Sequence, residues 1–441
     1  MKPYKAFLFI GITLLLLTTL LYLQEQVDWK SIPLFQRSTP ENININPLEQ
    51  DSDSVSAPVL LDMRMQHFPY DSIIDGIRMP LNKNFKALGR LFQRADSIGQ
   101  TARVLYFGDS QLEGDFLAAT VRQELQKVYG GHGPGLLAAD KYYSTLHHLS
   151  VNLSSNWKQS ERMDICKGNK SLVFRHANVS AGEQAWIKIG RIKLLSTLPD
   201  DYRQMRLFFL SEDSAQITIK SRNQVIASYR VAGAHEMRAI RLELDETAQN
   251  LRVDIKPHGY FEIECLSLDD THGAYVDNIP LRGKASPLFS ISDSTAIQGM
   301  FQMIKPNLFI LQFGANIIKY TNEDTVDNFH HQTIEQIKLI RRWCPNAEIL
   351  LISISDIAHR TNNGVESYGN ISKLKAMQYE IAMQYDCAFW DLDHFIKQEG
   401  GIKKWAGSSP ALAQSDYLHF TKYGARKVGL KLSELLLQSF Q

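Results

Sequence analysis

The sequence predicts an α/β domain with a parallel sheet that is interrupted by an all-β insertion. Before about residue 151 and again after 270, apolar strand-like runs alternate with helix-like runs, which is typical of a parallel sheet with crossover helices. Between Val151 and Asp270, short alternating runs such as AWIKIGRIKLL and MRLFFL follow one another without a convincing helix, which indicates a β-sandwich. The α/β piece in front of the insertion, 81–150, is too short to bury a core alone, so we expect it to fold with 271–441.

The first 24 residues predict a membrane anchor. Lys2 and Lys5 precede an uncharged apolar run, Ala6 to Leu23, which at helical rise nearly crosses a bilayer core. No small-residue cleavage pattern follows this run, so an uncleaved signal anchor is favoured over a removed signal peptide. The lysines place the N-terminus in the cytoplasm and the rest of the chain outside it, which favours the periplasm. Residues 25–80 are mostly polar and are predicted to be a tether.

The composition indicates a globular protein and excludes a nucleic-acid-binding surface. The chain of 441 residues is 44% hydrophobic and 10% aromatic, and its 48 basic and 47 acidic residues leave a net charge of +1. The paired histidines at 147–148 and 330–331 lack acidic residues at ligand spacing, so neither a metal nor a cofactor is expected.

The four cysteines fit an exported protein and match no zinc pattern. They are Cys166, Cys265, Cys344 and Cys387. Cys344 and Cys387 each precede a strand-like run, and neighbouring parallel strands could bring them together. Free or merely packed thiols are an equal alternative.

Polar residues follow three of the apolar runs, where a parallel sheet gathers its functional groups. The run RVLYF is followed by Gly108, Asp109 and Ser110. The run NLFILQF is followed by Gly-Ala-Asn, which ends at Asn316. The third segment, DYLHFTKYGA, contains Asp416 and His419 three positions apart. A serine, an imidazole and a carboxylate are the parts of a nucleophilic triad, and an asparagine amide can donate to an oxyanion.

Each of these residues has an ordinary structural explanation when it is taken alone. Ser110 would serve as a helix N-cap, Asp416 and His419 as a surface pair, and Asn316 as a turn residue. Their joint occurrence at the ends of predicted strands favours the triad. Asp356 also follows a predicted strand, but it lacks the Asp-x-x-His spacing and is a weaker candidate for the triad acid.

These motifs resemble the SGNH hydrolases, also called GDSL-like esterases, which have a flavodoxin-like α/β fold. FGDSQLEGD looks like the first block of the family, with Ser110 as nucleophile, and QFGAN looks like the third, with Asn316 in the oxyanion hole. SDYLHFTKYG looks like the fifth block and gives Asp416 and His419. The sequence departs from the pattern at Ile317, where the family usually has Asp, and at Gln111, where many members have Leu.

The resemblance also implies a glycine whose amide completes the oxyanion hole together with Ser110 and Asn316. The candidates are Gly283 and the cluster of Gly131, Gly133 and Gly135. In peptidoglycan O-acetylesterases of this superfamily, the glycine follows an inserted module of carbohydrate-binding type. Gly283 follows the predicted insertion here and is therefore preferred, whereas a tight turn explains the glycine cluster.

The resemblance implies a membrane-anchored extracytoplasmic serine esterase that removes O-acetyl groups from a surface glycan such as peptidoglycan. The acetylated glycan and the membrane are then the expected partners. Two alternatives stay open: an O-acetyltransferase of the same superfamily, and a non-catalytic glycan-binding scaffold that retains the fold.

Overall fold

A computed structural model of the chain describes residues 76–80, 83–95, 100–139, 149–159, 170, 172–173, 176–191, 202–244, 250–319 and 323–441. The predicted anchor, 1–24, and all of the predicted tether except 76–80 lie outside these residues. Within the described part, Arg78 forms an antiparallel bridge with Phe389, so the folded body begins before residue 81. No helix among the described residues is long and apolar enough to cross a bilayer.

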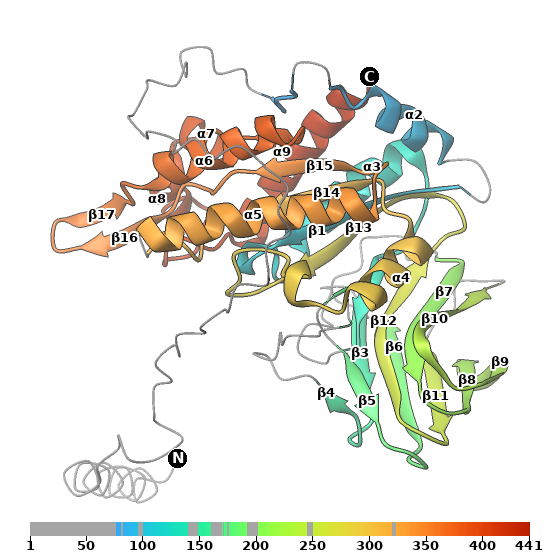
Figure 1. Ribbon diagram of the computed structural model, residues 1–441. Helices are drawn as coiled ribbons and strands as arrows, with labels where there is room; N and C mark the ends of the chain where they lie inside the picture. The colour runs from blue at the N-terminus through green and yellow to red at the C-terminus, as the bar shows by residue number, and fades with distance from the viewer. Residues whose placement is uncertain are drawn as a thin grey trace, which may run out of the picture. The chain divides into compact units, whose positions relative to one another are not determined.

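Five parallel strands form the sheet of the α/β domain (Figure 1). Their spatial order is β13 (Gly273–Pro280), β1 (Thr101–Gly108), β14 (Leu308–Gln312), β15 (Glu348–Ile352) and β18 (Ala388–Trp390). Because β1 is the first of these in the chain and β13 the second, the order is 2-1-3-4-5, which is that of flavodoxin-like folds. The prediction of an interrupted parallel α/β domain is confirmed.

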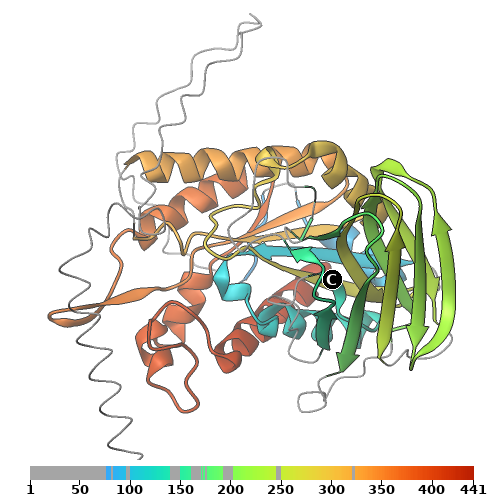
Figure 2. The ribbon, with the colours of Figure 1, turned by 90° about the horizontal axis from the view of Figure 1, so that it is seen from below.

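Helices cover both faces of this sheet (Figure 2). One layer contains α2 (Lys86–Arg94), α3 (Phe116–Tyr129), α7 (Leu392–Gln398), α8 (Gly401–Ala406) and α9 (Lys422–Phe440). The other contains α4 (Ser294–Ile304), α5 (Glu323–Trp343) and α6 (Ile371–Gln384). The alternation of β1 divides its side chains between the layers: Val104 and Tyr106 join the first core, and Leu105 and Phe107 join the second.

Two antiparallel sheets form the predicted β insertion and enclose a separate apolar core. One sheet has the order β10 (Ala234–Glu243), β7 (Gln204–Ser211), β12 (Phe261–Asp269), β5 (Ala177–Val179) and β4 (Lys158–Gln159), and β2 (Gly135–Ala138) also pairs with β12. The other has the order β3 (Leu149–Leu153), β6 (Ala185–Arg191), β11 (Leu251–Pro257), β8 (Ala215–Ser221) and β9 (Gln224–Val231). The insertion thus takes in β2 and starts at Gly135, ahead of the predicted Val151.

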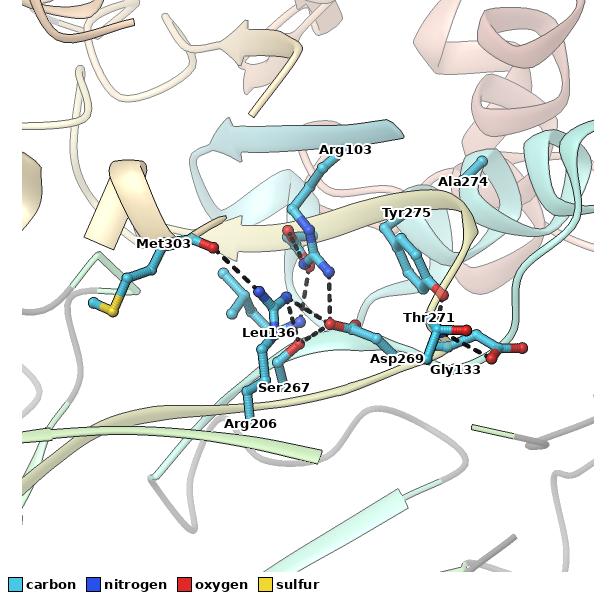
Figure 3. Close-up of polar contacts among 12 residues, drawn as sticks. Arg103, Gly133, Leu136, Arg206, Ser267, Asp269, Thr271, Ala274, Tyr275 and Met303 are labelled. Carbon is cyan, nitrogen blue, oxygen red and sulfur yellow. Dashed lines mark hydrogen bonds and ion pairs between the residues drawn. The ribbon is translucent and has the colours of Figure 1, made fainter. Parts of the chain in front are cut away.

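A buried charge network, here called the junction network, joins the insertion to the α/β sheet (Figure 3). Arg103 of β1 donates to both carboxylate oxygens of Asp277 of β13, at 2.9 and 2.8 Å, and to Oδ2 of Asp269 of β12, at 2.7 Å. Arg206 of β7 donates to the same oxygen of Asp269 at 2.6 Å. Arg103, Asp269 and Asp277 are at most 1% exposed. The two arginines and two carboxylates balance in charge, and burial nevertheless raises the pKa of Asp277 above its usual value.

The described cysteines, Cys265, Cys344 and Cys387, are free thiols. Cys344 and Cys387 therefore form no disulfide with each other, and the alternative of free or packed thiols is confirmed for both. Cys166 lies outside the described residues.

Candidate active site

Ser110 lies at the carboxyl end of β1, where the strand turns into a short 3-10 helix, η3 (Ser110–Leu112). The turn is tight: a Cβ on Gly108 would lie 2.7 Å from the Leu112 side chain and 2.9 Å from the Gln312 carbonyl oxygen, so only glycine fits there. Asp109 caps η3 by accepting the amide of Gln111 at 3.0 Å. The N-cap explanation therefore applies to Asp109, and the Ser110 hydroxyl is left for another interaction.

The structure brings the three predicted triad residues together in a continuous hydrogen-bonded chain. Ser110 Oγ lies 2.8 Å from His419 Nε2, and His419 Nδ1 lies 2.6 Å from Asp416 Oδ2. The second carboxylate oxygen of Asp416 accepts the amides of Leu418 and His419, each at 3.1 Å. This is the geometry in which an imidazole can take a proton from a serine while a carboxylate fixes its tautomer.

The local electrostatics keep Asp416 ionised. Partial burial raises the pKa of its carboxyl, but the hydrogen bonds from the His419 ring and from the two backbone amides outweigh burial and hold the pKa below its usual range. An ionised carboxylate at Nδ1 favours protonation of the imidazole during proton transfer.

The three predicted oxyanion donors also lie near one another. Leu281 donates its amide to the carbonyl of Gly108 at 2.7 Å, which ties the loop carrying Gly283 to the end of β1. Asn316 donates one amide hydrogen to the Lys284 carbonyl at 3.0 Å, which leaves its second hydrogen for another acceptor. Among the described residues, the amides of Ser110 and Gly283 have no hydrogen-bond acceptor.

The competing glycine cluster lies at the opposite edge of the sheet. A Cβ on Gly131 would approach the start of β13 at Gly273, at 3.0 Å, and one on Gly133 would clash with the carbonyl of Leu268 at 2.4 Å. Both glycines, and Gly135 with them, have positive φ angles. Only Gly131 approaches the amino end of β13, and Gly135 begins strand β2, whereas Gly283, also at positive φ, follows the carboxyl end of β13.

The carboxyl group of Asp109 is buried beneath the site, and the sequence did not predict its raised pKa. Burial raises its pKa to about 6, although hydrogen bonds from the amides of Gln111 and Ala315 and the charge of His419 lower it. The bond from Ala315 joins the loop after β1 to the loop after β14, which carries Asn316.

A chain of buried polar side chains, here called the polar relay, supports the loop that carries His419. The sequence did not predict it. Tyr106 donates to Gln312 Oε1 at 2.5 Å, and Gln312 donates to Gln111 Oε1 at 3.0 Å. Gln111 in turn donates to Ser355 Oγ at 2.7 Å and to the carbonyl of Leu418 at 2.9 Å. The departure from leucine at position 111 thus has a structural reason, since this amide fixes the residue before His419.

Asp356 has a supporting position outside the triad. Its carboxylate accepts the Ser367 hydroxyl at 3.2 Å and the Ile402 amide at 2.7 Å. These bonds hold the segment after β15 against the start of α8.

A separate cluster of metal-ligand type lies in the β insertion, at a place that the sequence did not single out. One ligand atom from each of His176, Glu262 and Glu264 falls within 4.8 Å of the others. Burial raises the pKa of Glu262, but hydrogen bonding to Glu264 and the charges of His176 and Lys170 are among the effects that hold it below its usual value. Protein groups thus offset the negative charge of this cluster.

The carboxyl edge of this flavodoxin-like sheet thus carries a hydrogen-bonded Ser-His-Asp arrangement. Neither the family models nor the curated proteins include a match to this sequence. Among solved structures, a peptidoglycan O-acetylesterase matches 79% of this chain and 95% of its own, with 20% sequence identity and a TM-score of 0.63. A family two carbohydrate esterase from Cellvibrio japonicus aligns over 70% of this chain and 98% of its own, at 11% identity and a TM-score of 0.27, which is too low to support an argument. The first match shows that this chain shares the fold of that esterase.

Proposed function

We propose that this protein is a serine esterase that removes O-acetyl groups from a carbohydrate, with peptidoglycan or another cell-surface glycan as substrate. The hydrogen-bonded chain from Ser110 through His419 to Asp416 carries the proposal. Shared fold with a peptidoglycan O-acetylesterase supports the substrate class. We further propose that residues 1–24 anchor the enzyme in the membrane, with the catalytic part outside the cytoplasm, since Ala6 to Leu23 is uncharged and apolar.

The geometry supports acyl transfer in two steps. Ser110 Oγ attacks the acetyl carbonyl carbon as His419 Nε2 takes the hydroxyl proton. The amides of Ser110 and Gly283 and the free hydrogen of the Asn316 amide stabilise the oxyanion that forms. When the C–O bond to the sugar breaks, His419 returns the proton to the departing sugar oxygen and leaves acetyl-Ser110.

Water completes the reaction. His419 takes a proton from a water molecule, whose oxygen attacks the acetyl carbonyl carbon, and the bond to Ser110 Oγ breaks as the proton passes to that oxygen. Acetate and free enzyme result. Asp416 accepts the Nδ1 hydrogen throughout, which holds the ring in position and stabilises the imidazolium. An O-acetyltransferase would differ only at this step, where a sugar hydroxyl would replace water.

The test is acetate release by the full chain from O-acetylated peptidoglycan, acetylated xylan and p-nitrophenyl acetate. We expect Ser110→Ala to lower kcat by about 10³-fold or more, because the nucleophile is lost. Ser228→Ala, in the exposed β9 strand of the insertion, is the matched serine control and should retain activity.

Three outcomes would redirect the proposal. Equal acetate release by wild type and Ser110→Ala would remove Ser110 as nucleophile. No release from any ester would favour the glycan-binding scaffold, and acetyl groups appearing on an added glycan would identify a transferase. Recovery of the chain in the soluble fraction, or protection of its folded part from protease added outside the cytoplasm, would contradict the proposed anchoring.

A further inference from the structure

A β-hairpin is attached to the triad loop and projects from the α/β domain (Figures 1 and 2). It consists of β16 (Ala358–Thr361) and β17 (Gly364–Ser367) and follows β15, so it lies at the same edge of the sheet as the triad. Ala358 donates its amide to the carbonyl of Tyr417 at 3.1 Å. The hairpin is therefore joined directly to the residue after Asp416.

The hairpin places Arg360 over the side chain of Tyr417. The guanidinium carbon lies 5.3 Å from the centroid of the tyrosine ring, and Arg360 is exposed. Tyr417 stands between the two triad residues of its loop, and neighbouring Cα atoms are about 3.8 Å apart. The guanidinium therefore lies within about 15 Å of Asp416, summed along the Tyr417 side chain and the backbone between them.

The base of the hairpin is held by several contacts. The Ser367 hydroxyl donates to Asp356 at 3.2 Å, the Tyr368 amide donates to the Ile357 carbonyl at 3.2 Å, and the His359 ring stacks on Tyr368 with centroids 4.2 Å apart. These contacts fix where Arg360 stands before any ligand binds, which reduces the ordering that binding would require.

The charge on Arg360 has no acidic partner within ion-pair distance among the residues that the structure describes. Arg282, beside the oxyanion residue Gly283, differs because Glu113 neutralises it at 3.1 Å. The planar face of Arg360 packs on Tyr417, while its N–H groups remain available. Guanidinium donors of this kind bind a carboxylate through two parallel hydrogen bonds.

We propose that Arg360 and Tyr417 form a subsite for a carboxylate-bearing sugar of the substrate glycan, with the carboxylate on the guanidinium and a sugar face against the ring. The inference rests on the proposed esterase function and deepens it, because it selects an acidic glycan over a neutral one. Peptidoglycan strands offer this chemistry where the stem peptide has been removed, since every second sugar then carries a lactyl group with a free carboxylate. Unsubstituted xylan and chitin chains lack it.

The kinetic test compares the full chain with Arg360→Gln, which removes the charge and keeps a polar side chain of similar length. We expect the ratio of kcat/KM for O-acetylated glycan strands freed of their stem peptides to kcat/KM for p-nitrophenyl acetate to fall about 10-fold to 100-fold, mostly through KM. The same ratio taken with acetylated xylan should stay within about twofold. Arg230→Gln in β9 makes the same charge change far from the triad and should leave all three activities at wild-type values. An unchanged ratio for the peptide-free strands in Arg360→Gln would overturn the subsite.

A binding test separates the subsite from the esterase proposal. Ser110→Ala binds without turnover, so its affinity for a muramyl oligosaccharide with a free lactyl carboxylate can be measured by calorimetry and compared with that for a chitin oligosaccharide of equal length. We expect tighter binding of the acidic ligand, and loss of that preference on adding Arg360→Gln. If no ester is cleaved but this preference depends on Arg360, the esterase proposal fails and the subsite stands. Equal affinities for the two ligands would refute the subsite whatever the activity.

Discussion

Gln111 offers a direct test of how the polar relay supports the triad. Its amide makes three hydrogen bonds, two buried ones to Gln312 and Ser355 and a partly buried one to the carbonyl of Leu418, and the residue is 6% exposed. Replacement by leucine keeps the volume but leaves these partners without the amide. At about 0.5 to 1.5 kcal/mol for each bond, the free energy of unfolding should fall by about 1.5 to 4.5 kcal/mol.

The same substitution should reduce activity beyond its effect on stability. Leu418 precedes His419, so releasing its carbonyl frees the imidazole to move away from Ser110 Oγ. A displacement of about 1 Å at a catalytic group can lower the rate by roughly a hundredfold, and we expect kcat for p-nitrophenyl acetate to fall about 10-fold to 100-fold. Urea denaturation gives the stability and initial rates under folding conditions give kcat.

Gln126 is the matched control for this experiment. Its amide donates to the carbonyls of Gly133 and Ala274 at 3.2 and 3.1 Å, at the sheet edge opposite the triad. Gln126→Leu should therefore lower stability with kcat near the wild-type value. If Gln111→Leu reduces kcat no more than Gln126→Leu does, the relay supports the fold and has no role in positioning His419.

Three further predictions follow from single buried or paired groups. Asp416→Asn should lower kcat by about 10³-fold to 10⁴-fold in steady-state assays, because it favours the wrong imidazole tautomer; a loss below tenfold would exclude Asp416 as the triad acid. Asp109 has a folded pKa raised from 3.8 to about 6, so its stabilising effect is full below about pH 3.8 and is lost as pH rises through 6. The stability of wild type relative to Asp109→Asn should therefore decrease by roughly 3 kcal/mol between pH 4 and pH 7 in urea titrations, and a pH-independent difference would contradict the raised pKa. Arg103→Met should lower the free energy of unfolding by about 3 to 5 kcal/mol or prevent folding, since it leaves buried carboxylates without a cation. Adding Asp277→Asn should restore part of the lost stability. A loss under about 1 kcal/mol for Arg103→Met would show that the junction network is dispensable.

The triad was predictable because of where its residues stand relative to apolar runs. Ser110 and Asn316 each lie three positions after the end of an apolar run, and parallel strands bring such positions to one edge of the sheet. The three-residue spacing of Asp416 and His419 added a second local signal. Each local pattern alone had an ordinary structural explanation, so the prediction depended on their joint occurrence and on the resemblance of the motifs to a known family. The structure places Ser110, His419 and Asp416 within hydrogen-bond distance of one another.

The groups that support the site were not predictable in this way. Gln111 meets Gln312 at a separation of 201 positions and Ser355 at a separation of 244, and no pattern in the sequence pairs these residues. Arg103, a charged residue in a strand, gives no sign in the sequence that its partner is Asp277, 174 positions away. These contacts depend on strand order, which a pattern of apolar residues does not specify.

The start of the insertion was misplaced for a related reason. The run of β2, Gly135 to Ala138, is four residues long and apolar, so it fits a strand of either sheet. Only its pairing with β12 assigns it to the insertion. Likewise, strand-like runs after Cys344 and Cys387 indicated neighbouring strands, but not whether the two thiols would meet.

The junction network limits how far the insertion and the α/β domain can be changed independently of each other. Arg103 belongs to the strand that delivers Ser110, and one of its two carboxylate partners, Asp269, belongs to the last strand of the insertion. A shortened protein that joined the chain across the insertion would keep every triad residue yet lose that partner from the middle of its sheet. An ancestor acquiring the insertion, or an engineer exchanging it for another module, must therefore change Arg103 and the module together.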